Sequence, residues 1–515
     1  MKQKLHSLAP WLFAMLGYIY DIAFFINHGR AMLDSDMAAE MVLANLMHKE
    51  HALLTKSWIY STEIRAAGMQ WFYCIGFWLA KDNWLMARTI GVAIALVIYF
   101  AAWMYLSKVL GWGQTGKWII AFLAWPFGFW YFFDIIWGAY YLPHSIFMVL
   151  SLALAIVAAK ERTNNRKAIQ ALVGLGVISL VSGLNGMRML VIFFLPLAVA
   201  GAVILYLSFR NNGKDGWFDK TSVKHRFAVI TFIAMFCNLM GYGINLKLFV
   251  NRYNFVNMEG MVWGKGSGSW LKTFKWYFDS FGYTDFSTKE VFSLGGIGAG
   301  CGLLLGFAVL FSIIRLVMNY KKLDEAGQIY VASLMAMFLV IGVVFTYAWG
   351  EEQYWLPIVH LGVGALFLEL KTDPLFKEFE VKALHYIVLA LAIISAVGII
   401  KCNVAHPLRA NQDFAPVIDF IEEKGYTKGV ASFWRSQVVA ELTNGQVEMW
   451  TMNDEYDDVF LWLQYNSHRQ IPTGEFFGLY LAEDTQGMET FRKTFKLDEE
   501  LVYDDGKYVI YQYNN

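Results

Sequence analysis

Long apolar blocks are the feature of this sequence that most restricts its fold. A helix needs about 20 mainly apolar residues to cross the hydrocarbon core of a bilayer. Eleven stretches come close to that length, at residues 9–27, 88–107, 117–134, 142–159, 168–184, 189–209, 227–246, 292–318, 328–348, 354–370 and 383–400. The sequence therefore predicts a polytopic α-helical membrane protein with about 11 transmembrane helices.

The composition supports this class and argues against others. Of the 515 residues, 57% are hydrophobic and only 16% are charged, whereas about 25% are charged in a typical soluble protein. The 42 basic and 42 acidic residues give a formal net charge of zero, so no overall field attracts a polyanion. A disordered chain, a nucleic-acid-binding protein and an ordinary cytosolic enzyme are therefore excluded.

The basic residues between the blocks predict the orientation, because cytoplasmic loops of membrane proteins carry an excess of Lys and Arg. The short outer loops at 135–141, 185–188 and 349–353 then contain a single basic residue, Arg188. With an odd number of spans, the C-terminus is expected outside. The inner loops receive Lys108, Lys117, Lys160, Arg162, Arg166, Lys167, Arg210, Lys214, Lys220, Lys224, Arg226, Arg315, Lys321, Lys322, Lys371, Lys377 and Lys382.

Three outer segments are longer than simple connections need to be. Residues 28–87 and 247–291 are two long outer loops of a transmembrane domain predicted over 1–400, and 401–515 have a soluble-like composition. Helix and strand patterns alternate in this last segment, which predicts a C-terminal extracytoplasmic α/β domain. Its expected helices are 414–424, 434–442 and 485–495, and its expected strands are 428–433, 446–452, 478–482 and 508–513. Long loops are often functional, so we expect the activity on the outer face.

Two carboxylates, Asp34 and Asp36, open the first outer loop. Apolar residues recur at helical spacing from Ser35 onward, which predicts a helix along the membrane surface or against the bundle. A second surface helix is expected at 69–79. Glu40 follows Asp36 by one turn on the same face. The two aspartates have two interpretations: they cap the helix, or one is a general base at the water boundary and the other orients it or holds a cation.

This arrangement resembles the GT-C superfamily of integral-membrane glycosyltransferases. The resemblance rests on Asp34-Ser35-Asp36 after the first span and on the topology of about residues 1–400. The most similar groups are the protein O-mannosyltransferases and the lipid A aminoarabinose transferases. The resemblance implies polyprenyl-phosphate-linked sugar donors, a soluble outer domain, and an aspartate of this loop as the base. Many members have a second acid where this chain has Met37, which leaves open whether Asp34 or Asp36 is catalytic; Asp36 is favoured, because it begins the helix.

Other polar residues on the outer side are candidates for binding substrate. Arg188 is the single cation of its turn, and it either binds a phosphate oxygen or extends to the membrane interface. His144 either donates to a phosphate or is structural. Glu351 and Glu352 are adjacent acids, which need water or a cation to stay charged together. Their expected partners are sugar hydroxyls, a divalent ion or Arg65. The candidate substrate-binding residues are Glu40, Arg65, Tyr141, His144, Arg188, Lys265, Glu351 and Glu352.

The sequence therefore predicts a hexosyl- or pentosyltransferase that uses a polyprenyl-phosphate-linked donor and an Asp general base, with inversion. The expected acceptor is a cell-envelope glycan, lipid or protein on the outer face of a plasma membrane, with a bacterial membrane as the default. Asp34 and Asp36 would permit Mg²⁺ or Mn²⁺ without requiring either. Two alternatives stay open, namely a transporter or flippase of polyprenyl lipids or sugars, and a non-catalytic scaffold for envelope assembly.

Overall fold

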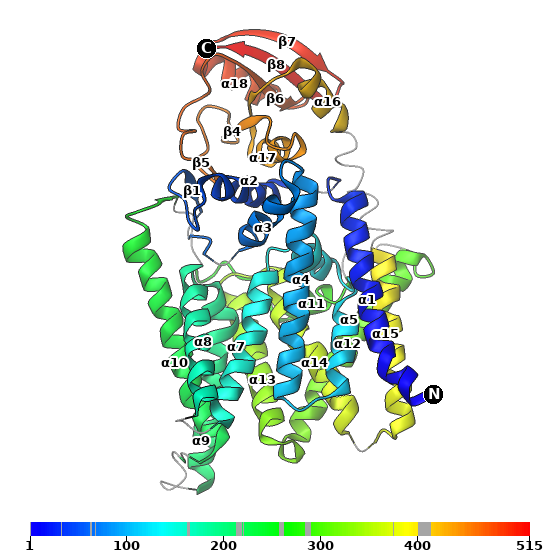
Figure 1. Cartoon of the computed structure of the whole chain (residues 1–515). Coiled ribbons are helices and arrows are strands. Elements are labelled where there is room, and N and C mark those ends of the chain that lie inside the picture. The colour runs from blue at the N-terminus through cyan, green and yellow to red at the C-terminus, as the bar shows by residue number, and fades with distance from the viewer. Residues whose placement is uncertain are drawn as a thin grey trace. The chain divides into compact units, whose positions relative to one another are not determined.

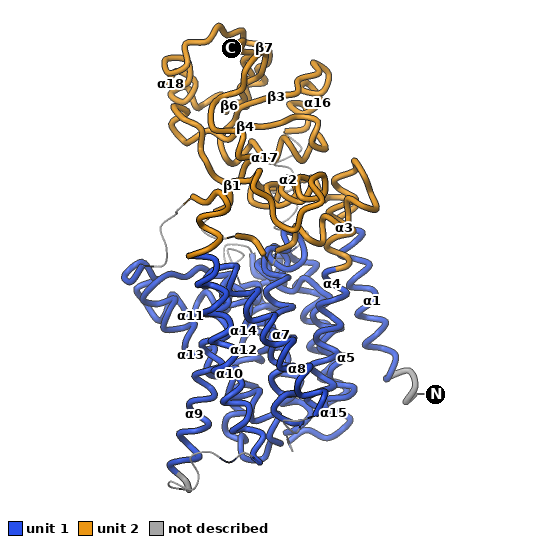
Figure 2. The backbone as a smooth tube through the Cα atoms, turned by 60° about the vertical axis from the view of Figure 1, so that its left-hand side comes forward, with its two compact units in different colours: residues 1–23, 95–246, 259–403 blue, residues 24–94, 247–258, 404–515 orange. Residues whose placement is uncertain are grey.

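The computed structural model of the chain describes residues 2–31, 33–61, 64–66, 68–161, 165–212, 219, 221–256, 262–283, 290–373, 375–399 and 414–515. Of the basic residues assigned to inner loops, Arg162, Lys214 and Lys220 lie outside the described residues. The chain divides into two compact units, coloured separately in Figure 2. Unit 1 comprises residues 1–23, 95–246 and 259–403, and unit 2 comprises 24–94, 247–258 and 404–515.

Ten helices of the described residues are long and apolar enough to cross a membrane. Each overlaps one of the apolar blocks of the sequence, which confirms the polytopic helical fold. The helices in these segments are α1 (Lys2–His28), α4 (Trp84–Val109), α7 (Leu142–Lys160), α8 (Arg166–Leu184), α9 (Leu195–Asn212), α10 (Val223–Ile244), α12 (Leu294–Met318), α13 (Glu325–Tyr347), α14 (Leu356–Thr372) and α15 (Glu378–Ile399) (Figure 1).

The block at 117–134 differs from the expectation of a continuous helix. The helix α5 (Gln114–Leu123) ends before Pro126, and a short α6 (Phe129–Tyr131) and a π-helix η1 (Phe132–Trp137) follow. Proline lacks an amide hydrogen and clashes with the preceding turn, so the helix stops there. The Tyr131 hydroxyl donates to the Leu123 carbonyl at 2.6 Å. A carbonyl at the helix end is thus satisfied within the protein, as non-helical backbone at membrane depth requires.

The ends of the unit 1 helices separate the predicted inner loops from the predicted outer loops. At the start of α13, Lys224 Nζ from a predicted inner loop donates to Gln328 Oε1 at 3.0 Å. At the end of α13, the Gly264 amide from the second outer loop donates to the Tyr347 carbonyl at 2.7 Å. The alternation predicted from the charges therefore holds along this helix. Which end faces the cytoplasm stays a prediction.

The C-terminal part of unit 2 has the α/β character that the sequence predicts. A five-stranded sheet has the order β4-β3-β6-β8-β7, in which β3 pairs in parallel with β4 and β6, and β8 pairs antiparallel with β6 and β7. The predicted boundary at residue 401 lies outside the described residues and stays a prediction. The strands are β3 (Lys428–Ser432), β4 (Glu448–Met452), β6 (Glu475–Leu481), β7 (Asp498–Asp504) and β8 (Tyr508–Asn514), and the helices are α16 (Ala415–Lys424), α17 (Phe433–Leu442) and α18 (Thr485–Phe495).

A second sheet joins all three outer segments within unit 2. It has three strands in the order β2-β1-β5. The central strand β1 (Trp58–Tyr60) comes from the first outer loop and pairs in parallel with β2 (Asn254–Phe255) of the second. On its other side, β1 pairs antiparallel with β5 (Gln464–Tyr465) of the C-terminal segment. Segments that the sequence presents separately therefore form one structural unit.

The two helices expected in the first outer loop are present as α2 (Ser35–Glu50) and α3 (Gln70–Ala80). The apolar spacing predicts one buried stripe on α2, but the helix is buried on almost every side, and it packs against both α3 and α17. Its alanines allow this close packing, because they add little width to the helix. The buried residues are Ser35, Met37, Ala38, Ala39, Glu40, Met41, Val42, Leu43, Ala44, Asn45 and Met47.

Candidate active site

The aspartates at the start of α2 have different environments. Asp34 is the N-cap of the helix, and its Oδ1 accepts a hydrogen bond from the Met37 amide at 2.8 Å. This bond satisfies one of the amide groups that a helix leaves without an internal partner. Asp36 lies in the first turn and is half-buried. The capping interpretation therefore applies to Asp34. Which of the two aspartates is catalytic stays a prediction.

Asp36 lies among charged groups of the same unit. Burial raises the pKa of Asp36 to about 6, Arg65 lowers this pKa, and Asp34 and Glu40 raise it. A carboxylate with this pKa is mostly ionised at neutral pH. It nevertheless accepts a proton more readily than an ordinary aspartate, because a general base works best when its pKa lies near the operating pH.

Arg65 and Glu40 form an ion pair beside this carboxylate. Arg65 Nη1 donates to Glu40 Oε1, and Gln70 Nε2 donates to the Arg65 carbonyl. Glu40 is 5% exposed, and no described residue donates a hydrogen bond to its Oε2. Burial raises the pKa of Glu40, and Arg65 lowers it. The Arg65 side chain is 25% exposed, so this cation is held in place and still reaches solvent.

Two other predicted residues, Arg188 and Tyr141, meet Tyr354 in unit 1, on the predicted outer side. The Arg188 guanidinium carbon lies 4.7 Å from the centroid of the Tyr141 ring and 5.4 Å from that of Tyr354. The two rings meet edge-on at 6.2 Å. Burial raises the pKa of Tyr141, although Arg188 lowers it, so the phenol stays protonated and able to donate. The group offers a partly exposed cation between two aromatic rings. Tyr354 was not among the sequence candidates, although it neighbours the acidic pair.

The remaining candidates near this group have local partners. The His144 ring lies 6.0 Å from the Tyr141 ring. Glu351 accepts a hydrogen bond from Gln353 Nε2, and the Glu352 carbonyl accepts one from the Ser280 hydroxyl at 2.8 Å. Both acidic side chains are half-buried.

One expected partner of the acidic pair has a partner within its own unit. Arg65 forms an ion pair with Glu40, and its contact with Glu351 and Glu352 stays a prediction. This ion pair lies within unit 2, to which residues 24–94 belong. The sequence could not distinguish these partners, because spacing along the chain does not show which acid an arginine meets.

Lys265 is exposed in a glycine-rich turn of unit 1. Two of these glycines lie close to the main chain at the end of α13. The Gly268 amide donates to the Thr346 carbonyl at 3.0 Å, and a Cβ on Gly266 would lie 2.5 Å from the same oxygen. Only glycine permits this close approach to the end of α13.

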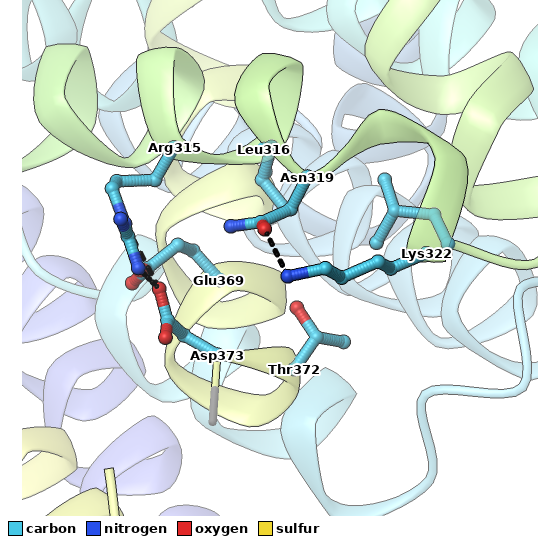
Figure 3. Close-up of a pocket in the computed structure, with 8 residues that line it drawn as sticks. Arg315, Leu316, Asn319, Lys322, Glu369, Thr372 and Asp373 are labelled. Carbon is cyan, nitrogen blue, oxygen red and sulfur yellow. Dashed lines mark hydrogen bonds and ion pairs between the residues drawn. The ribbon is translucent and has the colours of Figure 1, made fainter. Parts of the chain in front are cut away.

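A small pocket lies at the C-terminal ends of α12 and α14, next to the predicted inner loops (Figure 3). Its volume is about 30 Å³, which leaves room for roughly two water molecules. Arg315 Nε donates to Asp373 Oδ2 at 2.9 Å, and Lys322 Nζ donates to Asn319 Oδ1 at 2.9 Å. The pocket is too small for a lipid head group and none of the sequence candidates lines it, so we do not assign it to the site.

The metal prediction stays a prediction. Among the described residues, no group of three or more His, Cys, Asp or Glu side chains is arranged to hold a metal ion. One oxygen of Asp34 is used by the helix cap.

Sequence reasoning also missed Arg88 and Glu441, which are buried next to the Met37 carbonyl in unit 2. Arg88 could have been noticed in the sequence as a single arginine at the start of an apolar block, because charged residues are rare in such blocks.

The fold and these residues define a polytopic helical membrane protein, with a half-buried acid after its first span. The structure of ArnT from Cupriavidus metallidurans bound to undecaprenyl phosphate is similar to this chain, with a TM-score of 0.53. The match covers 98% of this chain and 97% of that chain at 11% sequence identity, so it shows the fold. This structural similarity confirms the expected fold. No protein-family model and no curated protein matches the chain.

Proposed function

We propose that the chain is a membrane glycosyltransferase, which moves a sugar from a polyprenyl-phosphate-linked donor to a cell-envelope acceptor. The observation that carries this proposal is the half-buried Asp36, whose pKa is raised to about 6 beside the cation Arg65. The fold supports it, because it is shared with ArnT, whose solved structure holds undecaprenyl phosphate.

In the proposed reaction, Asp36 removes the proton from an acceptor hydroxyl while the acceptor oxygen forms a bond to the anomeric carbon. The bond between this carbon and the phosphate oxygen breaks, and its electron pair leaves with the polyprenyl phosphate. The acceptor attacks from the face opposite the leaving group, so the anomeric configuration inverts. The charge that develops on the phosphate calls for nearby cations.

Each unit offers one cation for an anionic head group. In unit 2, Arg65 keeps part of its guanidinium exposed while it pairs with Glu40. In unit 1, Arg188 is held between Tyr141 and Tyr354. Guanidinium groups suit phosphate because their donors match two oxygens at once. Each cation is assigned from the geometry of its own unit, and each assignment has its own test.

The acidic pair and the remaining cation have proposed supporting roles. Glu351 and Glu352 accept hydrogen bonds from sugar hydroxyls, because ionised carboxylates are strong acceptors. Lys265 and His144 contact the donor as a second source of positive charge or of a donor group. The sugar is a hexose or pentose, and the outer face of a plasma membrane is the proposed location.

The test is a transfer assay with the purified full-length chain in lipid nanodiscs. The donors are synthetic polyprenyl-phosphate hexoses and pentoses, and the acceptors are envelope lipids, glycans and peptides. Mass spectrometry detects the product, and NMR determines its anomeric configuration. We expect a glycosylated product with inverted configuration and release of polyprenyl phosphate. Movement of intact donor across proteoliposomes, with no covalent product from any acceptor, would contradict the proposal and favour the transporter alternative.

A further inference from the structure

Arg88 is a fully buried cation near the start of α4. Its exposure is 1%, and that of Glu441 in α17 is 4%. Arg88 Nε donates to Glu441 Oε1 at 2.8 Å, and Nη2 donates to Glu441 Oε2 at 2.7 Å, which makes the pair bidentate. A buried ion pair often adds no more stability than well-packed apolar residues would. Stability alone therefore does not explain why Arg88 and Glu441 are paired in the interior.

The other donors of Arg88 reach the segment that carries Asp36. Arg88 Nη2 donates to the Met37 carbonyl at 2.9 Å, and Nη1 donates to the Tyr73 hydroxyl at 3.2 Å. The amide of Met37 is held by the Asp34 carboxylate at 2.8 Å. The main chain directly after Asp36 is therefore fixed through both its amide and its carbonyl.

The two ends of α17 also bind segments that flank Asp36. At the first end, the Ser35 hydroxyl donates to the Phe433 carbonyl. Beyond the last turn, Asn444 Oδ1 accepts hydrogen bonds from Arg30 Nη2 at 3.1 Å and from the Trp84 amide at 3.2 Å. The helix α17 and the turn that follows it thus contact the chain before the first turn of α2, within this turn and at the start of α4.

We propose that Arg88 is a positioning residue for Asp36, and that α17 is the frame to which it ties the first turn of α2. The C-terminal segment then has a role in catalysis without touching the substrate. The catalytic consequence rests on the proposed function, but the structural tie does not. A displacement of about 1 Å at a reacting group is enough to slow a reaction by about 100-fold. A first turn of α2 that is not held in place would therefore slow the proposed reaction.

The first test measures amide hydrogen exchange of the full-length chain, which needs no activity. Glu441→Gln breaks one charged contact to Arg88, and Ser35→Ala removes only the hydroxyl that binds Phe433. The matched control is Ser436→Ala, because the Ser436 hydroxyl contacts the same Phe433 carbonyl at 3.4 Å without reaching α2. We expect exchange at 36–40 to be about tenfold faster in the first two variants, because local opening becomes easier. Equal exchange in all three variants and the wild type would overturn the proposal.

The second test separates positioning from simple stability through steady-state kinetics. Arg88→Lys keeps the buried charge but cannot bind Glu441 in two places and Met37 as well. We expect this variant and Glu441→Gln to lower kcat by about 10- to 100-fold per folded molecule, with the KM for the donor nearly unchanged. Glu448→Gln, which loses the bond to His468 in the same unit, should keep the wild-type kcat. An unchanged kcat despite faster exchange at 36–40 would contradict the positioning role.

The two tests fail in distinguishable ways. If the wild-type chain transfers no sugar from any donor, the proposed function is wrong, while the exchange comparison still shows whether α17 fixes α2. If the wild type is active and exchange at 36–40 does not respond to Ser35→Ala or Glu441→Gln, the positioning proposal alone is wrong.

Discussion

Arg65 and Glu40 form an ion pair 25 positions apart in the sequence, and their charges act in opposite directions on Asp36. Arg65 lowers the pKa of Asp36, and Glu40 raises it. Burial is the largest influence, and it leaves the pKa at about 6. The basicity of the proposed catalytic group is therefore set by its position in α2 and adjusted by its charged neighbours, which makes it open to test by pH and by substitution.

The rate of transfer should fall in acid. A general base must be ionised, and the ionised fraction of Asp36 decreases as the pH falls through its pKa of about 6. We expect kcat/KM to decrease about tenfold for each pH unit below that value, as for loss of a single ionised group. A pH profile measured with saturating acceptor checks this. A rate that does not change one unit below this pKa would rule out Asp36 as the base.

Replacement of Arg65 should move that profile to higher pH. Arg65→Gln removes the cation that lowers the pKa of Asp36, so the acid limb should shift upward by about one unit. The same variant should raise the KM for the donor if Arg65 also contacts phosphate. Arg469→Gln is the control, because Arg469 is exposed and bonded to Asn466 in the same unit. A profile that is identical in wild type and Arg65→Gln would show that this arginine does not act on the base.

Substitutions of Asp34 distinguish a helix cap from a base. Asn caps a helix almost as well as Asp, whereas Ala does not, and the loss of a cap costs about 1 kcal/mol. Asp34→Asn should therefore keep the wild-type thermal unfolding temperature and most of its activity, with the acid limb shifted to lower pH because Asp34 raises the pKa of Asp36. Asp34→Ala should be less stable. If Asp34→Asn abolishes transfer while it stays folded, Asp34 is the base instead.

Loss of Arg188 should weaken donor binding more than it slows the chemistry. Arg188→Gln removes the cation that lies over Tyr141 and Tyr354. A hydrogen bond to a charged group contributes about 1.5–3 kcal/mol, so we expect the KM for the donor to rise by about tenfold or more. Arg210→Gln is the control, because Arg210 is an exposed cation of the predicted inner side. An unchanged KM would remove Arg188 from the donor site.

The transmembrane helices and several outer elements could be predicted from the sequence, because their signals are local. A lipid environment requires each span to satisfy its own backbone hydrogen bonds, so block length alone indicates a helix. The start of α2 at Ser35 follows from the capping residue Asp34. The strands β3, β4, β6 and β8 lie close to their predicted positions. The edge strand β7 was not predicted, because its acidic residues, with Leu501 exposed, hide the apolar alternation.

The parts that depend on distant contacts could not be predicted. Arg88 was counted within an apolar block, and its partner Glu441 lies 353 positions away. The burial of α2 on nearly all sides depends on α17, which no local period reveals. Pro126 divides one apolar block into two short helical pieces, although the hydropathy of the block continues through it. The candidate acids were predicted from residue type and position, whereas the helix-capping role of Asp34 is shown by the hydrogen bond from the Met37 amide.

The most direct test of the central claim compares the kcat of Asp36→Asn with that of the wild type, using the purified full-length chain and a polyprenyl-phosphate-linked sugar. General-base catalysis contributes about 10²- to 10⁴-fold, so we expect a loss of that size without a comparable change in the KM for the donor. Asp419→Asn, at an exposed position of α16, should retain the wild-type kcat. A kcat for Asp36→Asn within a few-fold of the wild-type value would contradict the account.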